Sequence, residues 1–145
     1  MQREGRSMTN APKTVLAIHD LPGFGRAALS VIVPVLSTLG VQTVALPTAV
    51  LSTHTMFSNF TCKDLTDQIG PIAAHWKSEG IGFDAIYTGY LASQEQIGDV
   101  CAFFDDFKTE ENLIVVDPVM VATSGSRLLR DDAMQALTEQ LLPLA

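Results

Sequence analysis

The sequence has no apolar run that approaches the roughly 18 residues typical of a membrane-spanning helix. Its start is polar and lacks the apolar segment of a secretory signal peptide. The cytoplasm is therefore the default location. We predict that residues 1–12 form a disordered tail outside the fold, in part an added segment that precedes a native start at Met8.

Basic residues and cysteines are also scarce. Nine lysines and arginines stand against 16 aspartates and glutamates, which gives a net charge of −7, and the basic residues form no cluster. Nucleic-acid backbones and anionic membranes both select basic patches, so neither is expected as the main partner. The two cysteines, Cys62 and Cys101, lack metal-ligand spacing and predict no disulfide framework. Cys101 falls on the apolar face of a predicted helix, and we interpret it as a core residue.

Short apolar runs alternate with amphipathic segments over the 145 residues, which predicts one α/β domain. Strands are expected at residues 15–18, 41–46, 84–87 and 113–116. Helices are expected at residues 27–39, 61–79, 93–104 and 131–142. This alternation indicates a mainly parallel sheet that is covered by helices on both faces.

Local signals set the expected helix boundaries. Thr61 with Asp64, and Ser93 with Gln96, match the capping-box pattern of a helix N-terminus. Pro34 lies inside the first predicted helix, and we expect it to kink that helix or to shift its start.

The loops that follow the four predicted strands should meet at one edge of the sheet, where ligands of open α/β sheets bind. The first loop, residues 20–26, contains Gly23 and Gly25, which allow the backbone to approach a ligand closely. Taken alone, these glycines are more often explained by an ordinary strand-to-helix turn. The loop matches neither the G-x-G-x-x-G dinucleotide pattern nor a P-loop.

The other three loops carry polar side chains. The second, residues 47–55, offers several hydroxyls and His54, and the third contains Tyr90. In the fourth, Asp117 is followed by the small residues 123–126, which suits a phosphate-and-magnesium region. Each feature also has a purely structural explanation: a local hydrogen bond for His54, rim packing for Tyr90, and a turn or helix cap for Asp117.

Taken together, these loops resemble the vitamin-kinase branch of the ribokinase superfamily, which holds the pyridoxal/pyridoxine kinases and the hydroxymethylpyrimidine (phosphate) kinases. The resemblance lies in Asp-Pro-Val-Met at residues 117–120, Ser-Gly at 124–125 and Leu-Leu at 128–129. Residues 48–55 match the Thr-x-x-x-Ser-x-His-Thr pattern of pyridoxal kinases, and residues 88–91 are similar to their Gly-Tyr-Leu segment. The similarity extends over residues 13–145.

The resemblance implies a three-layer αβα ribokinase-like fold with a mainly parallel sheet. Residues 13–145 would be the N-terminal part of a single kinase domain. The implied enzyme is an ATP-dependent pyridoxal/pyridoxine/pyridoxamine kinase of vitamin B6 salvage. It would transfer the γ-phosphoryl group of Mg-ATP to the ring hydroxymethyl group. ATP and Mg²⁺ would be its cofactors, with a monovalent cation as a further candidate, and the enzyme would be a homodimer.

The resemblance also implies roles for individual residues. The residues that would bind the pyridoxal-type substrate are Asp20, Gly23, Thr48, His54 and Tyr90, with the role of His54 left open. Gly89 would give room at the site. Asp117 and Ser124 would lie in the nucleotide and phosphate region, and Asp117 would be a candidate ligand of the cation.

The chain departs from the pyridoxal kinase pattern in three respects. His19-Asp20 stands where these kinases commonly have Ser-His, and Arg26 is not typical after the glycines. The Gly-x-Gly-Asp motif, which supplies the family's anion hole and aspartate base, does not occur in these 145 residues. We therefore predict no catalytic residue in this segment, a gene that continues past Ala145, and no kinase activity from residues 1–145 alone.

Three other functions stay open at this point. A hydroxymethylpyrimidine kinase acts on a ring of similar shape that also carries a hydroxymethyl group. A non-catalytic vitamin-binding or regulatory protein would keep the pocket without the chemistry. A receiver-type or flavodoxin-like domain would need an acidic pair after the first strand, where His19-Asp20 offers one acid.

Overall fold

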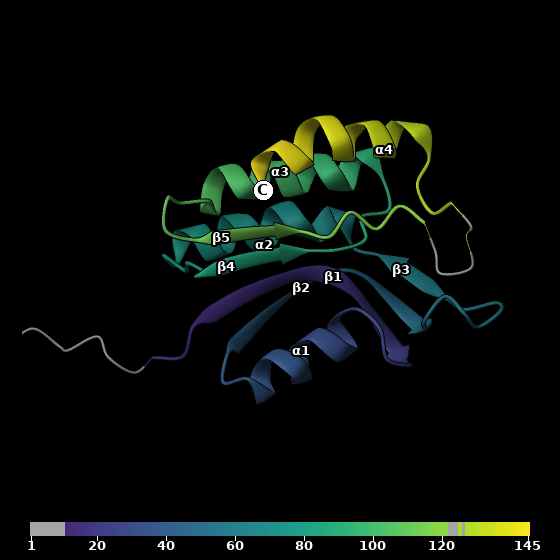
Figure 1. Ribbon diagram of the computed structural model, residues 1–145, viewed down its shortest axis with the longest axis horizontal. Coiled ribbons are helices and arrows are strands. Elements are labelled where there is room, and N and C mark those ends of the chain that lie inside the picture. The colour runs from purple at the N-terminus through teal and green to yellow at the C-terminus, as the bar shows by residue number, and fades with distance from the viewer. Residues whose placement is uncertain (1–10, 122–124, 126) are drawn as a thin grey trace, which may run out of the picture.

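The computed structural model describes residues 11–121, 125 and 127–145 (Figure 1). The predicted tail lies outside these residues, apart from Ala11 and Pro12. The strands are β1 (Thr14–Phe24), β2 (Gln42–Thr53), β3 (Cys62–Asp64), β4 (Ala85–Thr88) and β5 (Leu113–Val116). The helices are α1 (Leu29–Thr38), α2 (Thr66–Ser78), α3 (Gln94–Phe107) and α4 (Asp131–Ala136), which continues as a π-helical turn over Leu137–Leu141 and a 3-10 turn over Leu142–Leu144.

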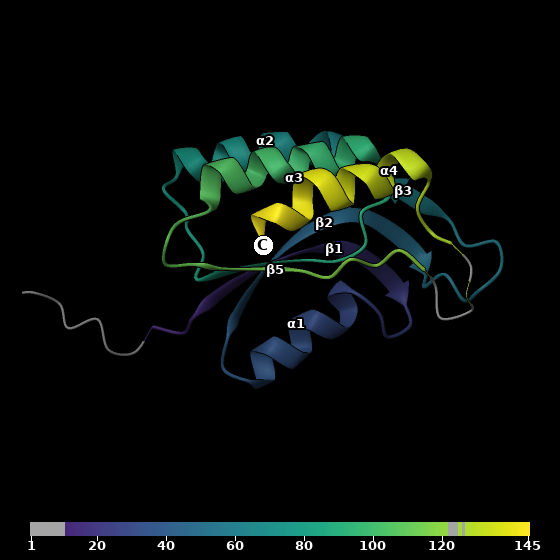
Figure 2. The ribbon, with the colours of Figure 1, turned by 45° about the horizontal axis from the view of Figure 1, so that its top comes forward.

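The described strands form one sheet in the order β3-β2-β1-β4-β5. All neighbours in it are parallel except β3, which pairs antiparallel with β2 at the edge. Helix α1 covers one face of the sheet, and α2, α3 and α4 cover the other (Figures 1 and 2). The expected three-layer α/β fold with a mainly parallel sheet is therefore confirmed.

The apolar core lies between the sheet and the helices α2, α3 and α4. Leu16, Ile18 and Ile86 supply it from the strands, and each is fully buried. Helix α3 contributes an apolar face in which the rings of Phe103 and Phe107 stack with their centroids 4.3 Å apart. None of the helices in the described part of the chain has both the length and the apolar character needed to cross a membrane.

The two longest strands continue past their predicted ends. Most of the expected first loop belongs to β1, and most of the expected second loop belongs to β2. The reason is that the two segments pair with each other beyond the ends of β4 and β5, with Leu21 opposite Val50 and Phe24 opposite Thr53. A register shift between His19 and Leu21 interrupts this ladder. Such irregularities bend a strand and redirect its side chains, which here lie at the carboxyl end of the sheet.

Helix boundaries were predicted with mixed success. The predicted N-cap at Ser93 is confirmed, because its Oγ accepts a 3.1 Å hydrogen bond from the backbone N–H of Gln96, whereas the Gln96 side chain bonds the N–H of Ala92 in place of that of Ser93. The predicted cap at Thr61 is wrong: the following residues form β3, and α2 begins only at Thr66. Helix α1 begins at Leu29, after the expected start, and passes through Pro34.

Candidate functional site

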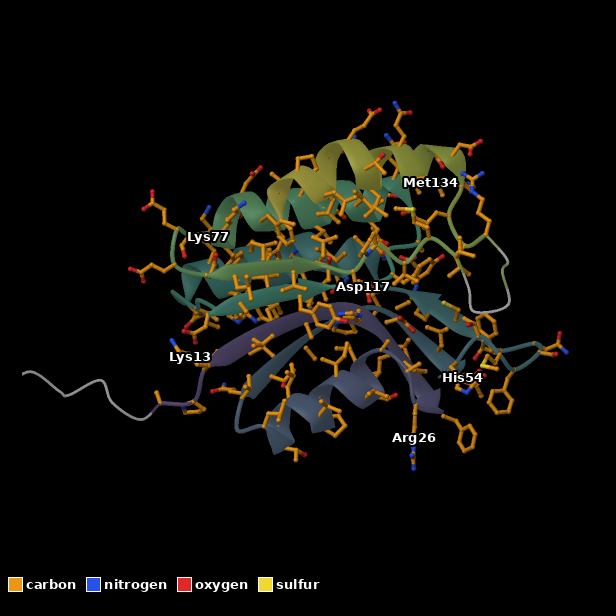
Figure 3. All side chains as sticks on the ribbon, in the orientation of Figure 1. Lys13, Arg26, His54, Lys77, Asp117 and Met134 are labelled. Atoms are coloured by element: carbon orange, nitrogen blue, oxygen red, sulfur yellow. The ribbon has the colours of Figure 1, made fainter. Side chains whose placement is uncertain are left out.

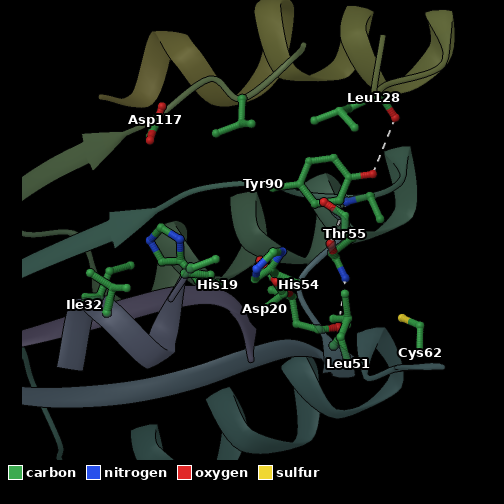
Figure 4. Close-up of a pocket in the computed structure, with 18 of the residues that line it drawn as sticks. His19, Asp20, Ile32, Leu51, His54, Thr55, Cys62, Tyr90, Asp117 and Leu128 are labelled. Atoms are coloured by element: carbon green, nitrogen blue, oxygen red, sulfur yellow. Dashed lines mark hydrogen bonds between the residues drawn. The ribbon is translucent and has the colours of Figure 1, made fainter. Parts of the chain in front are cut away.

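A cavity of about 590 Å³ opens at the carboxyl ends of β1, β2, β4 and β5 (Figure 4). Its lining extends from Asp117, near the middle of the molecule, toward His54 and Arg26, on the side away from Lys13 and Lys77 (Figure 3). All four strand ends contribute polar residues to its lining, among them His19, Asp20, Thr48, His54, Tyr87, Tyr90 and Asp117. The prediction that these segments meet at one edge of the sheet is confirmed, because parallel strands present their carboxyl ends together.

Strand β1 supplies Asp20 at the point where its ladder with β2 is irregular. The carboxyl group is half-buried, and this burial raises its pKa above the ordinary value for aspartate. Asp20 therefore holds its proton at a higher pH than an exposed aspartate does. In the cavity it offers both a hydrogen-bond acceptor and, when protonated, a donor.

Strand β2 supplies Thr48 and His54, which lie at different depths. Thr48 is buried, with 2% of its surface exposed. The imidazole of His54 packs against the ring of Phe57 and accepts a 3.3 Å hydrogen bond from the backbone N–H of Met56 at Nδ1. A Cβ at Gly25 would lie 1.9 Å from Cδ2 of His54, and Gly25 has a φ of +110°. Glycine is therefore required at this position both for its space and for its backbone conformation.

Tyr90 follows β4 and stands over the cavity. Its hydroxyl donates to the backbone oxygen of Leu128 at 3.5 Å, a long bond that Figure 4 marks with a dashed line. Burial raises the pKa of the Tyr90 phenol, and the negative charge of Asp20 adds to the shift. The phenol is therefore neutral in the physiological range and presents a flat apolar face with a polar tip.

Asp117 directly follows β5 and is exposed. Its backbone N–H donates to the oxygen of Thr88 at 2.9 Å, which fixes the residue at the end of the strand. Within the described ranges, no group of three His, Cys, Asp or Glu side chains has the geometry of a metal site. Mg²⁺ is usually bound by one or two carboxylates together with substrate phosphates. A lone carboxylate such as Asp117 fits Mg²⁺ only in that arrangement, with phosphates as the other ligands.

His19 was given no role by the sequence patterns, yet it lines the cavity. It is 4% exposed, and its Nε2 atom finds no hydrogen-bond partner among the described residues. The ring lies edge-on to Tyr87, with centroids 4.4 Å apart. Burial lowers the pKa of His19 to about 4, so the imidazole is neutral at physiological pH.

Gly89 leaves the space that His19 occupies. A Cβ at this glycine would lie 2.2 Å from Nδ1 of His19 and 2.3 Å from its Cε1. The room that the family resemblance implied at Gly89 is thus filled by a histidine side chain of the same protein. No signal in the sequence links these two positions, because they are far apart along the chain.

Two predicted site residues are not seen at the cavity. Gly23 is absent from its lining, and a Cβ there would lie 3.2 Å from the backbone oxygen of Ser52, so this glycine allows close pairing of β1 with β2. Ser124 lies outside the described residues. The lining instead includes Gln96 and Cys62, which the sequence had assigned to a helix cap and to no role.

Comparison with known proteins agrees with this geometry. The sequence profile of the phosphomethylpyrimidine kinase family matches residues 33–145. A hydroxymethylpyrimidine/phosphomethylpyrimidine kinase of Rhizobium meliloti is 34% identical over 130 residues, which cover 90% of this chain and 47% of that protein. Such matches cover most of this chain, but the chain spans only about half the length of these curated relatives.

Solved structures show the same similarity. A protein of Bacteroides thetaiotaomicron, provisionally named a phosphomethylpyrimidine kinase and crystallised with pyridoxal, is 45% identical, with a TM-score of 0.79 over 90% of this chain and 45% of that chain. Pyridoxal kinase of Staphylococcus aureus in complex with ADP is 25% identical, with a TM-score of 0.76 over 94% of this chain and 48% of that chain. The resemblance to the ribokinase-like vitamin kinases is confirmed, and the chain belongs to the phosphomethylpyrimidine kinase family.

Proposed function

We propose that residues 13–145 form the N-terminal part of a kinase domain that phosphorylates the hydroxymethyl group of a pyridoxal-type ring with ATP. The observation that carries this proposal is the cavity at the strand ends, whose 590 Å³ accommodates a small aromatic ring and part of a nucleotide. Its lining combines apolar side chains with a few polar groups, as is typical of sites for small aromatic ligands.

The polar residues of the cavity suit the recognition of a substituted pyridine. The Asp20 carboxyl group would bind the polar edge of the ring, as an acceptor when it is ionised and also as a donor when it is protonated. Thr48 would donate to a ring substituent, and the face of Tyr90 would pack against the ring. His54 would close the outer side of the cavity, where it already contacts Phe57.

Asp117 would bind the cation that accompanies the nucleotide. When bound, Mg-ATP supplies the phosphoryl group, and the ion neutralises charge that develops on the phosphates. The contribution of Asp117 would be to place that charge at the carboxyl end of β5. The family's aspartate base and anion hole do not occur in this sequence, so the proposed activity belongs to the full-length gene product.

Two observations bear on the choice of ring. The Thr-x-x-x-Ser-x-His-Thr pattern that contains Thr48 and His54 resembles pyridoxal kinases, and a 45% identical protein crystallised with pyridoxal. Against this, the curated relatives that match most of the chain are named hydroxymethylpyrimidine/phosphomethylpyrimidine kinases. We therefore propose pyridoxal as the preferred substrate and hydroxymethylpyrimidine as the second candidate.

The test is an ATP-dependent phosphorylation assay of the full-length gene product, with pyridoxal and hydroxymethylpyrimidine as alternative substrates. We expect kcat/KM to be higher for pyridoxal, and we expect no product from residues 1–145 alone. A higher value for hydroxymethylpyrimidine would reverse the order of the two candidates. Binding of either ring without phosphorylation would replace the kinase with a vitamin-binding protein.

Asp117→Asn is expected to lower kcat of the full-length gene product by about 100-fold, because the amide keeps the shape of the side chain but loses the charge that faces the cation. The matched control is Asp105→Asn, which removes an exposed carboxylate of α3 outside the cavity. Steady-state kinetics at saturating ATP and Mg²⁺ measure both variants. Equal kcat values for the two variants would exclude the proposed role of Asp117.

A further inference from the structure

Gln96, in the first turn of α3, connects three segments through a single buried amide. Only 1% of its surface is exposed. Its Oε1 atom accepts a 2.8 Å hydrogen bond from the backbone N–H of Ala92. Its Nε2 atom donates to Oγ1 of Thr66, at the start of α2, at 3.0 Å, and to the backbone oxygen of Thr48, in β2, at 3.3 Å. Every polar atom of the amide therefore has a partner, as burial of such a group demands.

Thr48 lies at a gap in the strand pairing of β2. On one side, the ladder with β1 pairs His19 with Pro47 and resumes only at Leu21 and Val50. On the other side, the ladder with β3 begins at Ala49. Thr48 has no partner in the ladder with β1, and it lies just before the first pair of the ladder with β3. Its backbone oxygen accepts hydrogen bonds from the Leu65 N–H, at 3.0 Å and in register with the β3 ladder, and from Nε2 of Gln96.

We propose that Gln96 is a positioning residue for the ring-binding side of the cavity, and that it acts by holding the backbone of Thr48. This inference rests on the proposed function, in which Thr48 contacts the substrate. Because the Thr48 oxygen points toward Gln96 and Leu65, its peptide plane cannot rotate without losing both bonds. The backbone of Thr48, and with it the position of its side chain at the cavity, is then fixed before any ligand arrives, which reduces the ordering cost of binding.

Gln96→Met is the principal test, because methionine keeps the length of the side chain and removes the amide. In the full-length gene product we expect KM for the ring substrate to rise at least about tenfold, while kcat and KM for ATP stay within about twofold. A higher KM with an unchanged kcat indicates that the enzyme binds the ring less tightly in the ground state and in the transition state alike. A role limited to folding would instead lower the amount of active enzyme and leave KM unchanged.

Two further variants test whether the rise of KM comes from the bond between Gln96 and Thr48 or from the loss of any amide hydrogen bond at α3. Thr66→Val removes the partner of Gln96 on α2 but leaves its bond to Thr48, so KM for the ring should change by less than about twofold. Asn112→Leu removes a comparable amide, whose Nδ2 donates to the backbone oxygen of Phe107 at 2.8 Å at the far end of α3. It should lower the thermal stability without changing KM for the ring.

A second measurement covers the case in which Gln96→Met folds poorly. Gln96→Glu keeps the acceptor for Ala92, and at a pH above the pKa of the buried carboxyl group, which burial raises, the ionised carboxylate has no donor for Thr48. Hydrogen exchange of the Leu65 amide, whose partner is the Thr48 oxygen, should then be faster than in the wild type. This exchange rate reports on the backbone of Thr48 independently of turnover.

The outcomes distinguish the inference from the proposed function. If the wild type phosphorylates neither ring and binds neither ring, the proposed function fails, and the role of Gln96 at a ring site fails with it. If the wild type is active but Gln96→Met has a wild-type KM for the ring, only the inference is overturned. An equal rise of KM in Gln96→Met and Thr66→Val, or an unchanged Leu65 exchange rate in Gln96→Glu, also overturns it.

Discussion

Gly89→Ala is expected to destabilise the protein by about 3 kcal/mol and to weaken binding of the ring substrate. The added Cβ would lie 2.2 Å from Nδ1 of His19, well inside the contact distance of the two atoms. The imidazole is buried against Tyr87 and lines the cavity, so moving it away from the added methyl group would break its contact with Tyr87 and change the shape of the cavity. The change must therefore displace the His19 ring, the end of β1 or the end of β4, and each of these contributes to the cavity wall.

Gly98→Ala is the matched control for this substitution. Gly98 lies within α3, and a Cβ there would meet nothing within 4 Å. Alanine is favoured over glycine inside a helix, so this variant should be more stable than the wild type by about 0.5–1 kcal/mol. Urea denaturation of both variants gives the comparison. Similar free energies of unfolding for the two would show that Gly89 has no steric role.

Acidification from pH 6.5 to pH 4 is expected to cost the folded state up to about 3 kcal/mol through His19 alone. Burial lowers the pKa of His19 from 6.5 to about 4. Below pH 6.5 the unfolded chain therefore binds a proton that the folded chain does not yet accept, and stability falls until the pH reaches the folded pKa. Above pH 6.5 neither state is protonated at this residue, and its effect vanishes.

His19→Gln should remove this loss of stability in acid, because an amide does not titrate in this range. Asp20 acts in the opposite direction: burial raises its pKa, so the folded state gains stability from this residue as its carboxyl group is protonated. Thermal unfolding measured at intervals between pH 7 and pH 4 separates the two effects. His75→Gln, a change at an exposed position of α2, is the control and should keep the wild-type slope. An equal slope in His19→Gln and the wild type would contradict the burial of a neutral His19.

The alternation of strands and helices was predictable because it rests on local periodicity. The apolar run that ends at Asp117 is a strand in the structure, and the helix capped by Ser93 begins where its capping box predicts. The placement of Asp117 and Tyr90 at one edge also follows from general rules, since the carboxyl ends of parallel strands lie together. These features need no knowledge of which distant residues meet.

The ends of β1 and β2 were predicted wrongly for the opposite reason. Glycine, proline and threonine around Gly23 and Thr48 favour loops when each segment is read alone. The two segments become strands because each supplies the hydrogen-bond partners of the other, from Leu21 opposite Val50 to Phe24 opposite Thr53. Here the pairing between two segments that are distant in the sequence outweighs the loop propensity of each segment.

The sequence by itself thus determined the α/β class, the edge of the sheet at which the cavity lies and the family resemblance, because each of these depends on local patterns of residues. Only the tertiary structure decided how the cavity is built. It placed the imidazole of His19 in the space left by Gly89, and the amide of Gln96 against the backbone oxygen of Thr48. Both contacts join residues that are distant in the chain, and such pairs are specified by packing in three dimensions rather than by spacing along the sequence.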